Sequence, residues 1–105
     1  MDDRFRLTYL ADIYGGLLTE KQQDILNRYL NEDISISEIA KDEEISRQAA
    51  FDLLKRSEKL IEGYEEKLGL FERYMRNSET ISEIEELCGN VPGASELLRK
   101  LRDNI

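Results

Sequence analysis

The sequence predicts an all-α protein built around a helix-turn-helix. Apolar residues recur at three- and four-residue spacing along most of the chain, and capping residues divide it into about six segments. The chain has only one proline, and 36% of its 105 residues are charged, which is typical of a helical protein. A chain of this length forms one modest core. We therefore expect a single helical domain over residues 1–105.

Two predicted helices precede the helix-turn-helix. The first covers about 3–14 and ends at Gly15 and Gly16, because glycine readily adopts left-handed backbone angles. The second is capped by Thr19, with Gln22 three residues later in the reciprocal position of a capping box. Its predicted buried stripe comprises Ile25, Leu26, Tyr29 and Leu30.

The helix-turn-helix is predicted at about 35–56. Ser35 caps a short helix that ends near Glu43, and Ser46 caps the next helix, so only Glu44 and Ile45 remain between them. Two helices joined so closely must cross at a large angle. The residues that fix this crossing are Ala40, at the position of closest contact, and Ile39, Ile45, Ala50 and Leu53.

The helix that starts at Ser46 is predicted to be long, over about 46–76. Two sets of residues repeat every seven positions, as in a coiled-coil seam. Gly63 and Gly69 each lower helix stability by about 1 kcal/mol, so a kink is compatible with the pattern. The seam is predicted to pack either on other helices of the chain or on a second copy in a homodimer. Its positions are Leu54, Ile61, Leu68 and Met75, alternating with Ser57, Tyr64 and Phe71.

A pair of C-terminal helices is predicted over about 80–105. Thr80 and Glu83 have the spacing of a capping box for a helix that ends at about Cys88. Pro92 is predicted to begin the last helix. The apolar positions of that helix are expected to dock on the long helix or on a second subunit, and they are Leu97, Leu98, Leu101 and Ile105.

The outward face of the second helix of the helix-turn-helix is the candidate nucleic-acid-binding site. Arg47 and Gln48, in its first turn, are suited to hydrogen-bond phosphates or base edges, and the backbone amides beside Ser46 are suited to a phosphate oxygen. The later basic residues of the face would follow the nucleic-acid backbone. The full set is Ser46, Arg47, Gln48, Phe51, Asp52, Lys55, Arg56 and Lys59.

Each of these residues also has a structural interpretation. Arg47 and Gln48 could be ordinary solvated residues at a helix start, and Phe51 could belong to the core instead of stacking on a base. Salt bridges to Glu58 and Glu62 would explain the basic residues that follow. Asp52 is expected to pair with Arg56 or to accept a hydrogen bond from cytosine N4.

Glu44 departs from the usual helix-turn-helix pattern, because glycine is common at this position of the turn. A left-handed backbone angle would strain a non-glycine residue there by about 1 kcal/mol. Glu44 also ends an acidic run with Asp42 and Glu43. The acidic run therefore opposes phosphate beside the candidate site.

The overall charge also opposes binding to a polyanion. The formal net charge is −8, although residues 35–59, with five basic and six acidic side chains, contribute only −1. About four basic contacts would give an affinity on the order of 10⁻⁴ to 10⁻⁵ M at physiological salt. Tight binding therefore needs a dimer with two recognition helices or a protein that holds the domain in place.

Composition argues against an enzyme. The chain has no histidine and one cysteine, Cys88, so it lacks common zinc ligand sets, internal disulfides and His-dependent nucleophile arrangements. It also lacks a glycine-rich phosphate loop. We therefore expect no catalytic residues, no metal and no cofactor. Without a membrane span or a secretion signal, we expect a cytoplasmic protein.

The residues also resemble known families. The segments "LTEKQQDILNRYL" and "SISEIAKDEEISRQAAFDLLKRSEKL", over about 18–60, resemble the region 4 helix-turn-helix of bacterial sigma factors. With "YLADIYGGLLTEKQ", "ISRQAAFD" and "YEEKL", the whole chain resembles the YlxM family of small DNA-binding proteins. Members are typically encoded beside the signal recognition particle GTPase. The resemblance implies a regulatory role connected with the signal recognition particle pathway.

These observations support two functional hypotheses. The first is a non-enzymatic regulatory protein that binds DNA, or the RNA of the signal recognition particle, and takes part in that pathway. The second is a protein–protein adaptor whose acidic surface docks on a basic partner such as the signal recognition particle GTPase, and the net charge of −8 favours it. Neither hypothesis involves a membrane.

Overall fold

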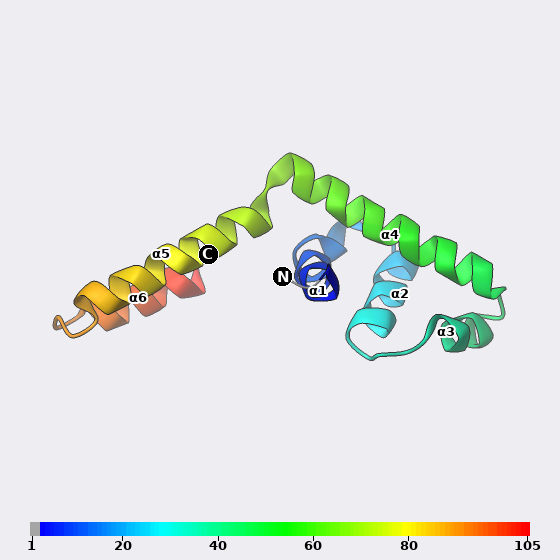
Figure 1. Ribbon diagram of the computed structural model, residues 1–105, viewed down its shortest axis with the longest axis horizontal. Helices are drawn as coiled ribbons and strands as arrows, with labels where there is room; N and C mark the ends of the chain where they lie inside the picture. Colours follow the sequence, from blue (N-terminus) through cyan, green and yellow to red (C-terminus); the bar gives the residue numbers. More distant parts are fainter. Residues whose placement is uncertain (1–2) are drawn as a thin grey trace. The chain divides into compact units, whose positions relative to one another are not determined.

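The computed structural model describes residues 3–105. These residues fold into six α-helices and one 3-10 turn, without a β-strand among them (Figure 1). This confirms the all-α prediction. The chain forms two compact units, one up to Gly69 and one from Leu70 to Ile105, and each is described by itself below. That the two units act as one domain stays a prediction.

The first unit consists of four helices and the 3-10 turn. These elements are α1 (Asp3–Tyr14), η1 (Gly15–Leu17), α2 (Glu20–Leu30), α3 (Ile36–Glu43) and α4 (Arg47–Leu68). The α4 helix packs against α1, α2 and α3, so it is the central element of this core. Its buried face includes Leu54, Ser57 and Ile61, each exposed by 1% or less. The burial of these seam positions places the first part of the predicted seam inside the chain. A homodimer through α4 would have to form without them.

Local capping confirms the predicted helix starts in this unit. The Thr19 hydroxyl accepts a hydrogen bond from the Gln22 N–H at 3.2 Å, and the Gln22 side chain accepts one from the Thr19 N–H at 3.0 Å. Ser35 caps α3 through the Glu38 N–H. In the stripe of α2, Ile25, Leu26 and Leu30 are buried, whereas Tyr29 is half-buried.

The helices α1 and α4 are joined by polar bonds as well as by packing. The Arg6 guanidinium donates to both carboxylate oxygens of Glu62, at 3.1 and 2.9 Å. The hydrogen bond that Arg6 donates to Glu62 raises the pKa of Arg6, which is already charged near neutral pH. The buried Tyr14 hydroxyl donates to the Glu65 carboxylate at 2.6 Å. These bonds fix α1 along the second half of α4.

The helix-turn-helix is formed by α3 and α4, as predicted. Ala40 and Ala50 are 4% and 0% exposed where the two helices pack, and Ile39 is buried beside them. Ile45 and Leu53 are half-buried. The Ile45 N–H donates to the Ala40 carbonyl at 3.0 Å, which closes the turn. The small side chain of Ala40 allows the close approach, because a larger one would separate the helices.

The predicted helix over 46–76 is wrong in its C-terminal boundary. The α4 helix ends at Leu68, and Gly69 caps it in the left-handed region with φ 62°. The Gly69 N–H donates to the Glu65 carbonyl at 2.8 Å, as in a glycine C-cap. Because a new helix starts at Leu70, the predicted seven-residue seam is interrupted and Met75 lies in the second unit.

The second unit is a hairpin of α5 (Leu70–Cys88) and α6 (Ala94–Asp103). The helix predicted to begin at Thr80 begins ten residues earlier, and Thr80 lies inside α5 with its hydroxyl donating to the Arg76 carbonyl at 3.0 Å. Hydroxyls inside helices commonly make this bond. The last helix starts at Ala94 after Gly93 in the left-handed region, and not at Pro92. Leu98 is buried, whereas Leu97 and Leu101 are exposed.

Glu44 has φ 56° and ψ 41°, so a non-glycine residue occupies the left-handed region at the turn. We predict that Glu44→Gly raises the free energy of unfolding by about 0.5–1 kcal/mol, because glycine adopts this angle without strain. Urea denaturation followed by circular dichroism measures the change. The control is Lys41→Gly in α3, which should lower the free energy of unfolding by about 1 kcal/mol. A destabilised Glu44→Gly variant would contradict strain at this residue.

Candidate nucleic-acid interface

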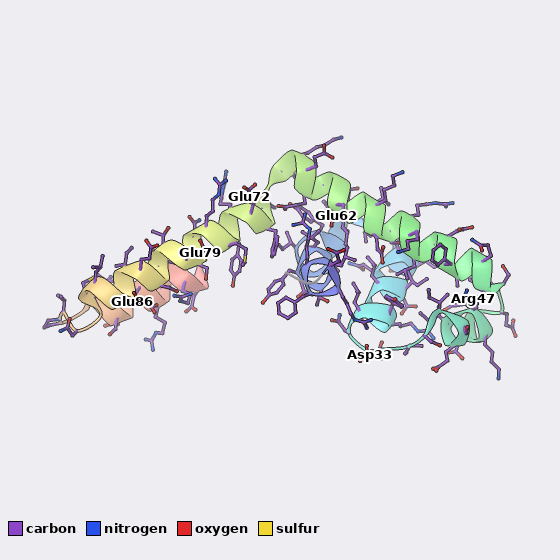
Figure 2. The ribbon with its side chains drawn as sticks, viewed as in Figure 1. Asp33, Arg47, Glu62, Glu72, Glu79 and Glu86 are labelled. Carbon is purple, nitrogen blue, oxygen red and sulfur yellow. The ribbon has the colours of Figure 1, made fainter. Side chains whose placement is uncertain are left out.

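The start of α4 exposes the residues predicted for nucleic-acid binding. Arg47 and Gln48 are exposed in its first turn, which confirms their predicted orientation towards solvent. Figure 2 shows Arg47 where α4 begins, beside α3. Phe51 is the one half-buried member of the set, so its ring contributes to packing as well as to the surface. The other exposed members are Ser46, Asp52, Lys55, Arg56 and Lys59.

Ser46 and Arg47 are held by bonds at the helix-turn-helix junction. The Ser46 hydroxyl accepts from the Ala49 N–H at 3.0 Å and so fixes the start of α4. The Arg47 Nε donates to the Ser37 hydroxyl of α3 at 3.2 Å. A guanidinium carries five N–H donors, and this bond uses one of them. Arg47 is therefore oriented by α3 and retains donors that can bind a phosphate or a guanine.

Asp52 interacts with Gln48 and not with Arg56. The Gln48 amide nitrogen donates to the Asp52 carboxylate at 2.9 Å, so the predicted Asp52–Arg56 pair is wrong. Both residues lie four positions from Asp52 and compete for it. The observed bond lies one turn nearer the start of α4, and it holds the Gln48 side chain along the exposed face. Arg56 therefore keeps its charge for an external ligand.

The later basic residues divide into paired and unpaired ones. Lys55 lies 3.3 Å from the Glu58 carboxylate and 5.5 Å from the centre of the Phe51 ring, so the predicted salt bridge along the helix is confirmed for Lys55. Glu62 pairs with Arg6 of α1 and does not pair with Lys59. Within residues 3–105, Arg56 and Lys59 form no ion pair. Arg47, Arg56 and Lys59 are thus the cations most readily available for phosphate.

The acidic run of α3 is partly neutralised by Arg28 of α2. The Arg28 guanidinium lies 2.7 Å from the Asp42 carboxylate, 3.0 Å from that of Glu43 and 3.6 Å from that of Asp24. Its side chain is only 15% exposed, so the charge is held at the α2–α3 contact. Glu44 is not part of this cluster. Two of the three acids that oppose phosphate therefore share the single positive charge of Arg28, and Asp24 also pairs with it.

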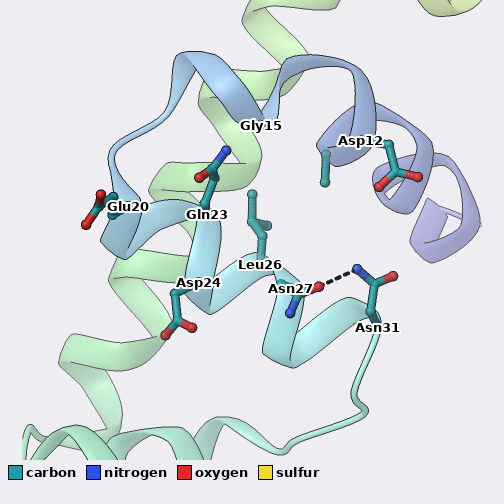
Figure 3. Close-up of a pocket in the computed structure, with 9 residues that line it drawn as sticks. Asp12, Gly15, Glu20, Gln23, Asp24, Leu26, Asn27 and Asn31 are labelled. Carbon is teal, nitrogen blue, oxygen red and sulfur yellow. Dashed lines mark hydrogen bonds between the residues drawn. The ribbon is translucent and has the colours of Figure 1, made fainter.

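A separate pocket lies between α1, η1 and α2 (Figure 3). Its volume is about 390 Å³, and the Asn31 amide donates to the Asn27 amide oxygen within its wall at 2.8 Å. The acidic lining disfavours phosphate and favours a cationic ligand. Its charged and amide residues are Asp12, Glu20, Gln23, Asp24, Asn27 and Asn31. The residues 3–105 contain no cluster of metal-binding side chains.

The description of the family that matches this chain also names a helix-turn-helix. The family model for UPF0122, described as "Putative helix-turn-helix protein, YlxM / p13 like", matches residues 1–100. The chain belongs to the UPF0122 family.

Curated UPF0122 relatives come from several bacteria. A UPF0122 protein of Halalkalibacterium halodurans is 39% identical over 96% of this chain and 93% of its own length. One from Geobacillus kaustophilus is 39% identical over 96% and 92% of the two chains. One from Clostridium kluyveri is 51% identical over 69% of this chain and 65% of its own length. These names specify neither a ligand nor a partner.

Sequence reasoning missed Arg28 and the pocket, although both belong to this UPF0122 fold. The spacing of Asp24 and Arg28 predicts a pair within α2, but Asp42 and Glu43 lie 14 and 15 residues farther along the chain. No helical period connects residues across a loop.

No helix in the described part of the chain is long and apolar enough to cross a membrane.

We predict that Arg28→Ala lowers the free energy of unfolding by about 1 kcal/mol at low salt, because it leaves three carboxylates close together. The loss should shrink at high salt, since the acids are largely exposed and screened. Denaturant melts at two salt concentrations measure both effects. Arg56→Ala, an exposed arginine without an ion pair in residues 3–105, is the control and should change stability little. An equal loss of unfolding free energy in both variants would show that the ion pairs of Arg28 do not stabilise the fold.

Proposed function

We propose that this chain is a non-enzymatic regulatory DNA-binding protein that takes part in the signal recognition particle pathway. One observation carries the DNA-binding part: Arg47 and Gln48 are exposed in the first turn of the second helix of a crossed helix-turn-helix. In this motif the second helix enters the major groove and its N-terminal residues contact base edges. Its resemblance to proteins encoded beside the signal recognition particle GTPase supports the pathway.

The side chains have chemically distinct roles in this proposal. Arg47 can bind O6 and N7 of guanine or a phosphate, and Gln48 can bind N6 and N7 of adenine. To do so, Gln48 exchanges its bond to Asp52 for bonds to the base. Lys55, Arg56 and Lys59 follow the phosphate backbone farther along α4. The Ser46 hydroxyl caps the start of α4, and the backbone amides beside it can donate to a phosphate oxygen.

Electrostatics limits the strength of a single contact surface. Arg47, Lys55, Arg56 and Lys59 would release about four counterions, and Lys55 must also give up its pair with Glu58. The expected affinity of one site is therefore weak, on the order of 10⁻⁴ M at physiological salt. Specific regulation then requires a second recognition helix or a partner that raises the local concentration.

A second candidate function is a protein–protein adaptor. The net charge of −8 and the acid-lined pocket between α1 and α2 both favour a basic partner, such as the signal recognition particle GTPase. In this function α3 and α4 form a scaffold, and Arg47 has no ligand. The two functions differ in whether substitution at Arg47 changes binding.

We predict that Arg47→Ala weakens duplex DNA binding about 10-fold, because it removes a base or phosphate contact. The slope of log affinity against log salt is negative, and Lys59→Ala should reduce its magnitude by about 1. The measurement is a titration of labelled duplexes, enriched from a random pool, at two salt concentrations. The particle's RNA is titrated in parallel. The matched control is Lys67→Ala, an exposed lysine in the last turn of α4 about 30 Å from Arg47, and it should bind as the unsubstituted protein does.

Two results would reject the DNA-binding proposal. One is the absence of binding to any duplex. The other is that Arg47→Ala and Lys59→Ala both bind duplex DNA as strongly as the unsubstituted protein does. Binding to the particle's RNA alone, lost in Arg47→Ala, would assign the same surface to RNA. Retained binding to the purified GTPase in Arg47→Ala, with no nucleic-acid binding, would support the adaptor.

A further inference from the structure

The α5–α6 unit leaves much of its apolar surface uncovered. Figure 1 shows α6 running back along α5, and Leu98 of α6 is buried. Arg102 reinforces the pair through bonds to the hydroxyls of Ser78 and Ser82 and to the Glu85 carboxylate. The buried apolar side chains of Leu70–Ile105 are Phe71, Ile81 and Leu98. A two-helix hairpin of this size needs further burial to be stable.

Two leucines of α6 supply a defined exposed stripe. Leu97 is 66% exposed and Leu101 is 48% exposed. They are four residues apart and therefore lie one above the other on one face of the helix. Leu98, the neighbour of Leu97, is only 7% exposed, and consecutive residues of a helix point in different directions. The stripe is thus distinct from the surface that α5 already covers.

The charges beside this stripe are arranged for pairing with an identical helix. Glu96 precedes Leu97, Lys100 precedes Leu101, and both are exposed. When two such helices pack antiparallel about a two-fold axis, Leu97 of each copy lies beside Leu101 of the other. The same operation places Glu96 of each copy near Lys100 of the other. Both the apolar and the charged positions are therefore self-complementary.

We propose that the Leu97–Leu101 stripe of α6 docks antiparallel on the same stripe of a second copy of this chain. The charge balance of α6 supports this occupant. Although the chain carries −8, α6 has three basic residues, Arg99, Lys100 and Arg102, against Glu96 and Asp103. Self-association is least opposed by electrostatic repulsion at such an element.

The pairing would give the molecule two recognition helices. Its consequence for DNA rests on the proposed function, whereas the pairing itself depends only on the surface of α6. Two linked α4 helices bind two half-sites with a combined affinity far above that of one site. This supplies the second contact surface that four basic residues per chain require.

Sedimentation equilibrium of the full chain, from micromolar to millimolar concentration, tests the pairing. The unsubstituted protein should form a dimer. Leu97→Asp should raise the dissociation constant of that dimer about 100-fold or more, because each substitution occurs in both copies of the interface. Leu97 is exposed, so the substitution should leave the circular dichroism spectrum unchanged. The matched control is Leu17→Asp at η1, where a leucine of the first unit is 59% exposed, and it should remain dimeric.

A charge exchange tests the antiparallel arrangement. Glu96→Lys and Lys100→Glu should each weaken the dimer several-fold, and the double substitution should restore it. A monomer at every concentration would overturn the proposal, and so would equal weakening by Leu17→Asp and Leu97→Asp. Failure of the double substitution to restore the dimer would overturn it as well. In each of these cases, DNA binding that still depends on Arg47 would leave the proposed function intact.

Discussion

The close contact between α3 and α4 at Ala40 is the constraint on which the candidate interface depends. Ala40 and Ala50 are buried there, and the Ile45 N–H bonds the Ala40 carbonyl. This short turn requires a left-handed angle at Glu44, which the chain adopts despite the strain. Because α4 leaves the turn at once, its first residues face solvent while its next turns enter the core. Exposure of Arg47 and burial of Leu54 are two results of the same geometry.

The charge distribution reconciles an acidic chain with a basic contact surface. Arg28 partly neutralises Asp42 and Glu43 on the helix next to that surface, and Glu62 pairs with Arg6 on α1. Asp52 is occupied by Gln48, which leaves Arg56 without an internal partner in residues 3–105. The remaining cations are few, so one chain is expected to bind nucleic acid weakly. Two linked chains would bind more tightly. The proposed pairing of α6 with a second copy would supply such a linkage.

The helix starts could be predicted from the sequence because capping is local. Thr19, Ser35 and Ser46 each bond an N–H three residues away, and all three were predicted as caps. The same pattern at Thr80 misled, because a hydroxyl followed by a glutamate also occurs inside a helix, where it bonds the carbonyl four residues earlier. Gly69 was identified as a weak point of the helix. Its left-handed cap, however, cannot be distinguished from a tolerated glycine without the packing around it. The cluster at Arg28 spans α2 and α3, so no local period predicts it.

We propose that the crossing at Ala40 makes the first turns of α4 the nucleic-acid contact surface. Amide chemical shifts of the ¹⁵N-labelled chain, followed while an enriched duplex is added, test it most directly. We expect the largest shifts at Arg47, Gln48 and the exposed residues that follow them on α4. Shifts confined to the acid-lined pocket or to α5 and α6, with the amides of Arg47 and Gln48 unchanged, would contradict it.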